Sequence, residues 1–189
     1  MKHILISFRL FLVLTIITGV IYPAAVTIVA KLFFPYQANG SLITREDKVI
    51  GSELLAQKFV DNKYFWPRPS AGDYSTVASA ASNLGPTNAK LKELISVREN
   101  EFREKNQLLK EQIVPAEMVL TSASGLDPDI SIAAARLQVK RISTARNFDQ
   151  RKTAAVLELI DKYTINRQYA IFGEHRVNVL MLNVALDSL

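Results

Sequence analysis

The side chains that most often catalyse reactions are scarce in this chain of 189 residues. It contains no cysteine, which excludes thiol catalysis and metal sites built from thiolates. Its two histidines are His3 and His175. A serine hydrolase would have to combine His175 with Ser122 or Ser124, but the sequence around these serines lacks the Gly-x-Ser-x-Gly turn that exposes a nucleophile. We therefore predict that His175 is a surface loop residue.

Sequence motifs for binding phosphate or metal ions are equally scarce. The sequence has no glycine-rich P-loop and no aspartyl-phosphate motif, so we expect neither nucleotide hydrolysis by this chain nor a metal site. Asp127-Pro128-Asp129 places two carboxylates close together, but the other acidic positions and the glycine of a calcium loop are absent. Because carboxylates suit the N-terminus of a helix, we expect Asp127 or Asp129 to stabilise the helix that follows.

One short segment has the composition of a protein interface. Residues 64–71 contain three aromatic residues, two prolines and an arginine. Prolines stiffen the backbone, and aromatic residues together with arginine are typical anchors of interfaces. The aromatic side chains could equally cover the core of the domain, and both interpretations stay open. Gln138 lies at the edge of the apolar stripe of a predicted helix, where a glutamine more often bonds to a neighbouring backbone group than to a ligand.

These residues follow a long apolar run that predicts a membrane anchor. Residues 10–30 are uncharged, and as a helix they would extend roughly 32 Å, enough to cross a hydrocarbon core of ~30 Å. Arg9 and Lys31 close the two ends. The run exceeds the ~7–15 apolar residues of a cleaved secretory signal, which favours a retained anchor. We predict a short N-terminal segment, residues 1–9, and a transmembrane helix, residues 10–34.

The remaining residues, 35–189, are enough for one α+β domain with one core. Strands and helices do not alternate regularly, which argues against a parallel α/β sheet. The predicted elements are a hairpin over 40–51, a short helix from Ser52 to Phe59, an irregular stretch over 63–86, helices over 88–112, 131–146 and 150–163, and strands over 117–122 and 177–184.

The charge distribution argues against nucleic acid as a partner. The chain carries 23 basic and 18 acidic residues, and three of the basic ones, Lys2, Arg9 and Lys31, flank the apolar run. The region after the run is therefore close to neutral. Basic residues are nearly balanced across the run, so the positive-inside rule does not decide the orientation. Because large domains translocate with little regard to charge, we expect a cytoplasmic N-terminus and an extracytoplasmic domain at the inner cell membrane.

Several segments, taken in order, resemble the C subunit of the Kdp potassium-transporting ATPase. The resemblance covers the whole chain, and its ordered combination of motifs is more specific than any one of them. The motifs are FFPYQANGSL (33–42), GSxLLxQxF (51–59), Tyr64-Phe65, Arg68-Pro69-Ser70-Ala71, SNLGP (82–86), TSASGLD (121–127), Gln138, Arg141, Ala145-Arg146, and the segments 177–179 and 182–187.

This resemblance implies a non-catalytic subunit of an ATP-driven, high-affinity potassium uptake complex in the lipid bilayer. Its partners would be a channel-like subunit that translocates K+, a P-type ATPase subunit, and a small fourth membrane subunit. The family's C subunit is held to act as a catalytic chaperone that raises the ATP affinity of the ATPase subunit. A glutamine matching Gln138 is implicated in nucleotide contact. ATP would then be bound through the ATPase partner, with direct contact to this chain left open, and K+ would be carried by the complex.

An extracytoplasmic domain raises a geometric problem for that role, because ~30 Å of bilayer would separate Gln138 from cytoplasmic ATP. We expect the effect to be transmitted through the helices of the partner subunits. Another possible role of the domain is to cover or steady the potassium entrance of the channel-like subunit. The alternatives to an accessory subunit are a membrane-anchored hydrolase using Ser124 and His175, and an anchored solute-binding domain with the Tyr64–Trp66 segment as its wall.

We predict that polar residues outside the periodic segments contact the partners. The predicted interface residues are Arg68, Ser70, Asn83 and Asp127. Asn83 could instead hold a turn through its side chain. The family usually carries a Gly-Gly pair where this chain has Ala80-Ala81, and alanine adopts positive φ less readily than glycine. We therefore expect a differently shaped loop at that point.

Overall fold

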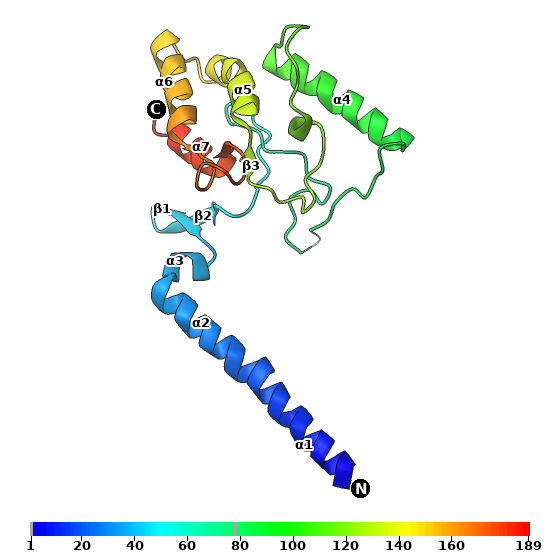
Figure 1. Cartoon of the computed structure of the whole chain (residues 1–189). Helices are drawn as coiled ribbons and strands as arrows, with labels where there is room; N and C mark the ends of the chain where they lie inside the picture. The colour runs from blue at the N-terminus through cyan, green and yellow to red at the C-terminus, as the bar shows by residue number, and fades with distance from the viewer. Residues whose placement is uncertain (1, 78) are drawn as a thin grey trace. The chain divides into compact units, whose positions relative to one another are not determined.

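A computed structural model describes residues 2–77 and 79–189 (Figure 1). It divides into one unit that ends at Ser52 and a second that begins at Glu53. The predicted fold class, an N-terminal apolar helix followed by a compact α+β domain, is confirmed.

The first unit consists mainly of one long apolar helix. It comprises α1 (Lys2–Ile16), a π-helical turn (Ile17–Ile21) and α2 (Tyr22–Phe33). This helix is long and apolar enough to cross a membrane. The π-helical turn precedes Pro23, whose ring leaves the carbonyl of Gly19 without its usual donor. Helical structure begins at Lys2, so the predicted N-terminal segment, residues 1–9, continues the helix over the residues described.

A short helix and the predicted hairpin complete the first unit. Helix α3 (Pro35–Ala38) precedes β1 (Leu42–Arg45) and β2 (Lys48–Ser52), which pair antiparallel. Glu46 and Asp47 turn the chain with positive φ values of 50° and 60°. The Ser52 hydroxyl donates to the Gly40 carbonyl oxygen at 2.7 Å. The hairpin prediction is thus confirmed.

The second unit packs helices against a small antiparallel sheet. Its elements are α4 (Ala89–Asn106), a 3-10 turn (Ala116–Met118), β3 (Asp129–Ile130), α5 (Ile132–Ala145), α6 (Gln150–Lys162), β4 (Thr164–Ile165), β5 (Arg176–Asn178) and α7 (Val179–Leu186). The strand order is β3-β5-β4. Side chains at the N-caps of the four helices accept backbone N–H bonds, as their sequences favour. These caps are Asn88, Ser131, Asp149 and Asn178.

The core of this unit lies around α5, which packs against α4, α6 and β5. One buried aromatic residue, Phe65, comes from the irregular stretch rather than from a helix or strand. The other buried core residues are Phe102, Met118, Ile130, Ala134, Ala135, Val139, Ile142, Val156, Ile160, Val177, Val179, Leu182 and Leu186. Residues 63–77 and 79–86 contain no helix or strand, as predicted. This stretch nevertheless contributes to the core through Phe65.

The predicted helix from Ser52 to Phe59 is wrong. Ser52 ends β2 instead of capping a helix. The Ala56 N–H donates to the Leu126 carbonyl oxygen at 2.9 Å, so this segment takes a backbone partner from a distant loop. The predicted helix over 88–112 ends at Asn106, because Gln107 adopts the left-handed conformation with φ 53°. A left-handed residue of this kind is a common helix terminus.

Both strand predictions for the C-terminal half need correction. Residues 117–122 include the end of a 3-10 turn rather than a strand, with Met118 and Val119 buried. In the run 177–184, strand β5 ends at Asn178, whose side-chain oxygen accepts from the Met181 N–H at 3.1 Å and caps α7. A continuous apolar run fits a buried helix as well as a buried strand, and here the asparagine cap favours the helix.

Candidate functional site

Buried polar side chains hold the aromatic-proline segment, residues 64–71, against the helices of the second unit. The central one is Arg141 on α5, whose guanidinium donates to the carbonyl oxygens of Asn62 (2.6 Å) and Tyr64 (2.9 Å) and to the side-chain oxygens of Asn106 (2.9 Å) and Gln138 (2.8 Å). Its Cζ also lies 3.8 Å from the centroid of the Trp66 ring. Burial lowers the pKa of Arg141 to about 10, so the side chain stays charged at neutral pH.

Two amide side chains form hydrogen bonds to the backbone of the same segment. Gln138 is fully buried; its Oε1 accepts from the Trp66 N–H at 2.7 Å, and its Nε2 donates to the Trp66 carbonyl oxygen at 3.3 Å. Asn183 on α7 makes the same pair of bonds to Phe65: it accepts from the Phe65 N–H at 2.8 Å and donates to the Phe65 carbonyl oxygen at 3.0 Å. These amides replace the backbone partners that a neighbouring strand would supply. An irregular segment is thereby fixed in one conformation.

Arg146, the C-cap of α5, binds the residue just before the segment. Arg146 Nε donates to the Lys63 carbonyl oxygen at 2.8 Å, and its Nη2 lies 2.7 Å from Asp187 Oδ1. The Tyr64 hydroxyl donates to the other oxygen of Asp187 at 3.2 Å. The C-terminus of α7 and the aromatic segment are therefore joined through one carboxylate.

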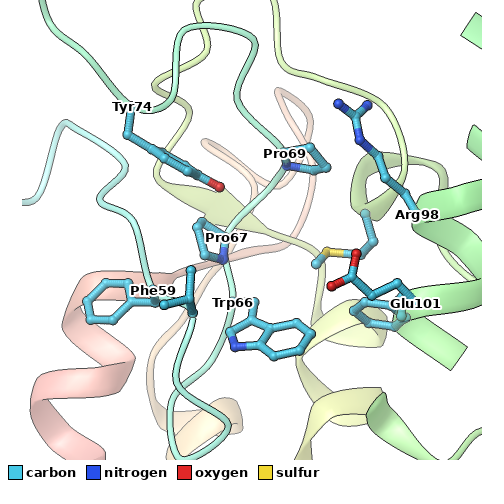
Figure 2. A pocket seen from close by; sticks show the side chains of 10 residues that line it. Phe59, Trp66, Pro67, Pro69, Tyr74, Arg98 and Glu101 are labelled. Atoms are coloured by element: carbon cyan, nitrogen blue, oxygen red, sulfur yellow. The ribbon is translucent and has the colours of Figure 1, made fainter. Parts of the chain in front are cut away.

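The fixed segment forms one wall of a cleft of about 270 Å³ (Figure 2). Figure 2 shows Trp66, Pro67 and Pro69 facing Arg98 and Glu101 of α4, with Tyr74 and Phe59 completing the loop side. The Tyr74 hydroxyl donates to the Arg68 carbonyl oxygen at 2.8 Å, and burial raises the pKa of Tyr74 to about 12. The cleft therefore combines aromatic and proline surface with one guanidinium and one carboxylate.

Three of the four predicted interface residues lie near one another: Arg68 and Ser70 within this segment, and Asp127 in the loop that packs against it. Arg68 Nη1 forms an ion pair with Asp127 Oδ2 at 2.5 Å, and both side chains are partly exposed. The Ser70 hydroxyl oxygen accepts from the Tyr74 N–H at 2.9 Å. Gly125 brings the 121–127 loop against Ser70, because a Cβ placed on it would lie 3.0 Å from Ser70 Oγ. The sequence motifs around residues 68–71 and 121–127 thus meet in space.

The fourth predicted interface residue, Asn83, is separate. It is exposed and adopts a left-handed conformation with φ 52°. Among the contacts that the structure describes, its side chain holds no turn. Ala80 and Ala81 both keep negative φ, so the chain accommodates alanine there without backbone strain. The left-handed turn of this loop falls on Asn83 instead, a residue type that tolerates it.

Neither neighbouring carboxylate caps α5. Asp127 forms an ion pair with Arg68, and Asp129 Oδ2 accepts from Arg176 Nε at 2.8 Å. Burial raises the pKa of Asp129 above its usual value, although Arg176 acts in the opposite direction. Ser131 caps the helix, accepting the Ala134 N–H at 3.1 Å.

Gly125 offers a direct test of how tightly these two loops meet. We expect Gly125→Ala to lower the free energy of unfolding by about 2 kcal/mol, because its φ of +70° strains any side chain and its new Cβ would lie 3.1 Å from the Ala80 carbonyl oxygen. Urea unfolding of the full chain in detergent, followed by fluorescence of Trp66, measures this change, since Trp66 is the chain's one tryptophan.

The matched control is Gly85→Ala, where no atom beyond the two chain neighbours lies within 4 Å of the new Cβ. It should change the free energy of unfolding by less than about 0.5 kcal/mol. Equal losses for the two variants would show that the approach of the loops at Gly125 contributes nothing to stability.

The residues of a serine hydrolase are not assembled. His175 is exposed, as predicted, and its Nδ1 lies 3.1 Å from Asn166 Oδ1. Ser122 is buried, and Ser124 Oγ accepts the Leu126 N–H at 3.1 Å. Among residues 2–77 and 79–189, no group of three or more His, Cys, Asp or Glu is placed to hold a metal ion.

The sequence analysis did not identify several side chains of this site that come from distant parts of the chain. Arg98, Glu101 and Tyr74 line the cleft, yet Arg98 and Glu101 are indistinguishable in sequence from other charged residues of α4. Asn106 and Asn183 carried a weak signal, because asparagine is unfavourable inside a helix and within an apolar run. Both are buried and hydrogen-bonded.

Comparisons with known proteins cover almost the entire chain. A family model described as KdpC, K+-transporting ATPase, c chain, matches residues 4–188. The potassium-transporting ATPase KdpC subunit of Mycobacterium tuberculosis is 47% identical over 190 residues, which is 100% of this chain and 99% of the relative. Proteins of the same name from Dechloromonas aromatica and Methylococcus capsulatus are 47% identical over 182 residues (95% and 93% of the two chains) and 46% identical over 191 residues (100% and 98%).

Proposed function

Because this chain belongs to the family of c chains of K+-transporting ATPases, we propose that it is a non-catalytic accessory subunit of an ATP-driven potassium uptake complex. The observation that carries the proposal is the match at 47% identity over the full length to relatives named as subunits of that ATPase. A potassium-translocating channel-like subunit, a P-type ATPase subunit and a small fourth membrane subunit are the partners. Hydrolysis of ATP and passage of K+ belong to those partners.

The chemistry of the described residues supports a non-catalytic role. The buried polar side chains of Arg141 and Gln138 form hydrogen bonds to the backbone of residues 62–66. These two side chains therefore fix the shape of a surface. The aromatic-proline segment and the Arg68–Asp127 pair are the surface that we propose for partner contact.

The N-terminal helix attaches the chain to the membrane. None of its residues is buried within this chain, so lipid or helices of partner subunits must cover it. Three threonine hydroxyls donate to carbonyl oxygens of their own helix, so they need no hydrogen-bond partner from outside it. They are Thr15, Thr18 and Thr27. We propose a cytoplasmic N-terminus and an extracytoplasmic C-terminal unit, as expected for a large domain that follows a single anchor.

We propose that Gln138 influences ATP affinity indirectly, by positioning Trp66. Its side chain is fully buried, and both of its polar atoms are bonded to Trp66 or Arg141. With the domain outside the membrane, ~30 Å of bilayer separates this residue from ATP. A subunit that contacts the partners more favourably in the nucleotide-binding state raises their affinity for ATP without touching the nucleotide.

Two substitutions of Gln138 test this role in the assembled complex. We expect Gln138→Ala to raise the KM for ATP by roughly tenfold with kcat unchanged, within the ~5–150-fold range of allosteric coupling. Gln138→Glu keeps an oxygen that can accept from the Trp66 N–H and from Arg141, so it should restore most of the affinity. Steady-state ATP hydrolysis by the purified complex measures both values.

Direct contact between residue 138 and a nucleotide would give the opposite order. A carboxylate would repel the phosphates, so Gln138→Glu would be at least as damaging as Gln138→Ala. Arg136→Ala is the control on the same helix, because Arg136 pairs on the surface with Asp161 and should leave KM unchanged.

A further inference from the structure

The loop between β4 and β5 ends in an exposed apolar turn. Gln168 and Phe172 pair across the loop, with both N–H to carbonyl distances at 2.9 Å. The side chains of Tyr169, Ile171 and Phe172, which we call the apolar tip, are 88%, 72% and 64% exposed. The described part of the domain thus leaves three large apolar side chains in water within four consecutive positions.

The residues of this turn are poorly suited to its backbone. Tyr169 and Ala170 are consecutive left-handed residues with φ 53° and 61°. Hairpin turns of this conformation favour Asn-Gly, and an exposed tyrosine there gains nothing from packing within the chain. The local fold therefore does not account for the choice of Tyr169.

Two basic residues precede the apolar tip along the chain. Lys162 and Arg167 are exposed, and neither takes part in an ion pair among the residues described. Glu174 is the one acidic residue between positions 162 and 176, while Arg176 is occupied by Asp129. Aromatic and aliphatic side chains flanked by unpaired basic ones suit the headgroup region of a bilayer that contains anionic lipid.

We infer that the apolar tip inserts into the surface of the membrane in which the chain is anchored, so that the C-terminal unit has a second lipid contact besides the helix. Three side chains can bury only roughly 400 Å², whereas a stable protein interface takes about 800 Å² from each partner. A weak lipid contact is sufficient here, because the anchor holds the domain at an effective concentration of roughly millimolar. The inference requires the membrane anchor and not the transport function.

Site-specific fluorescence on the full chain tests this inference, and the absence of native cysteine simplifies labelling. Ala170→Cys carries an environment-sensitive fluorophore at the tip, and Ile113→Cys carries it at another exposed apolar position of the same unit. Both chains are reconstituted in vesicles of phosphatidylcholine and phosphatidylglycerol, with and without a headgroup-level spin-labelled lipid. We expect a blue-shifted emission and severalfold stronger quenching at position 170 than at position 113.

A variant that keeps the label but loses the tip completes the test. Replacing Tyr169, Ile171 and Phe172 with serine in the Ala170→Cys chain should remove both the blue shift and the additional quenching. Equal quenching at positions 170 and 113 would overturn the inference. A blue shift that appears only in the assembled complex and is insensitive to the lipid quencher would also overturn it, and would assign the tip to a protein partner.

Discussion

Replacing Arg141 with methionine lowers the free energy of unfolding of the C-terminal unit by about 3–5 kcal/mol. Methionine keeps much of the side-chain volume but donates no hydrogen bond. The carbonyl oxygens of Asn62 and Tyr64 and the side-chain oxygen of Asn106 lose their arginine donor. Each buried polar group left unpaired costs about 1–3 kcal/mol, and the cation–π contact with Trp66 is lost as well.

Removing a buried charge could also stabilise a protein, because burial disfavours the charged form of Arg141 and lowers its pKa to about 10. We expect the loss to dominate, because the side chains of Asn106 and Gln138 are fully buried and methionine cannot bond to their oxygens. Chemical unfolding of the full chain in detergent, read by Trp66 fluorescence, gives the free energy directly.

Arg136→Met is the matched control on the same helix. Arg136 lies 2.8 Å from Asp161, and both side chains are more than half exposed to solvent. Its loss should therefore change the free energy of unfolding by less than about 1 kcal/mol. If the two variants were equally stable, the network around Arg141 would not be what holds the aromatic segment.

Local sequence signals predict the helices of the C-terminal unit well where apolar residues recur with helical spacing. The predictions over 131–146 and 150–163 agree with α5 (Ile132–Ala145) and α6 (Gln150–Lys162) to within one residue at each end. Serine and aspartate at their starts supply caps that the sequence shows directly. The hairpin in the first unit is predicted equally well, since its turn is polar and its strands are short.

The errors have a different physical origin. The run 177–184 has no polar interruption except Asn178 and Asn183, so its period does not separate strand from helix. The structure resolves this by using Asn178 as a cap and Asn183 as a partner for Phe65. The segment after Ser52 fails as a helix because Ala56 bonds to Leu126, a partner that no local pattern reveals.

The candidate site was only partly visible in the sequence for the same reason. Periodicity placed Gln138 at the edge of the core, whereas it is fully buried because residues 62–66 cover it. The composition of residues 64–71 left an interface and a core cover open. The structure shows the core cover, since Phe65 is buried in the core, and it places Trp66 on the wall of the cleft, where the interface stays a prediction. Contacts between segments that are distant in sequence decide such outcomes.

The second large effect concerns the complex rather than the fold. Removing this chain should lower potassium-stimulated ATP hydrolysis by the remaining subunits at least roughly tenfold at low ATP. An accessory subunit that stabilises the nucleotide-binding state of its partners has its greatest effect when ATP is below saturation. The measurement is ATP turnover, with and without K+, by complexes purified through a tag on the ATPase subunit.

That comparison also tests most directly the claim that this chain is an accessory subunit of a potassium-transporting ATPase. We expect turnover to fall when the chain is absent, to return when the purified full chain is added back, and to be undetectable for this chain alone. Unchanged potassium-stimulated turnover and unchanged ATP affinity in the complex without this chain would contradict it.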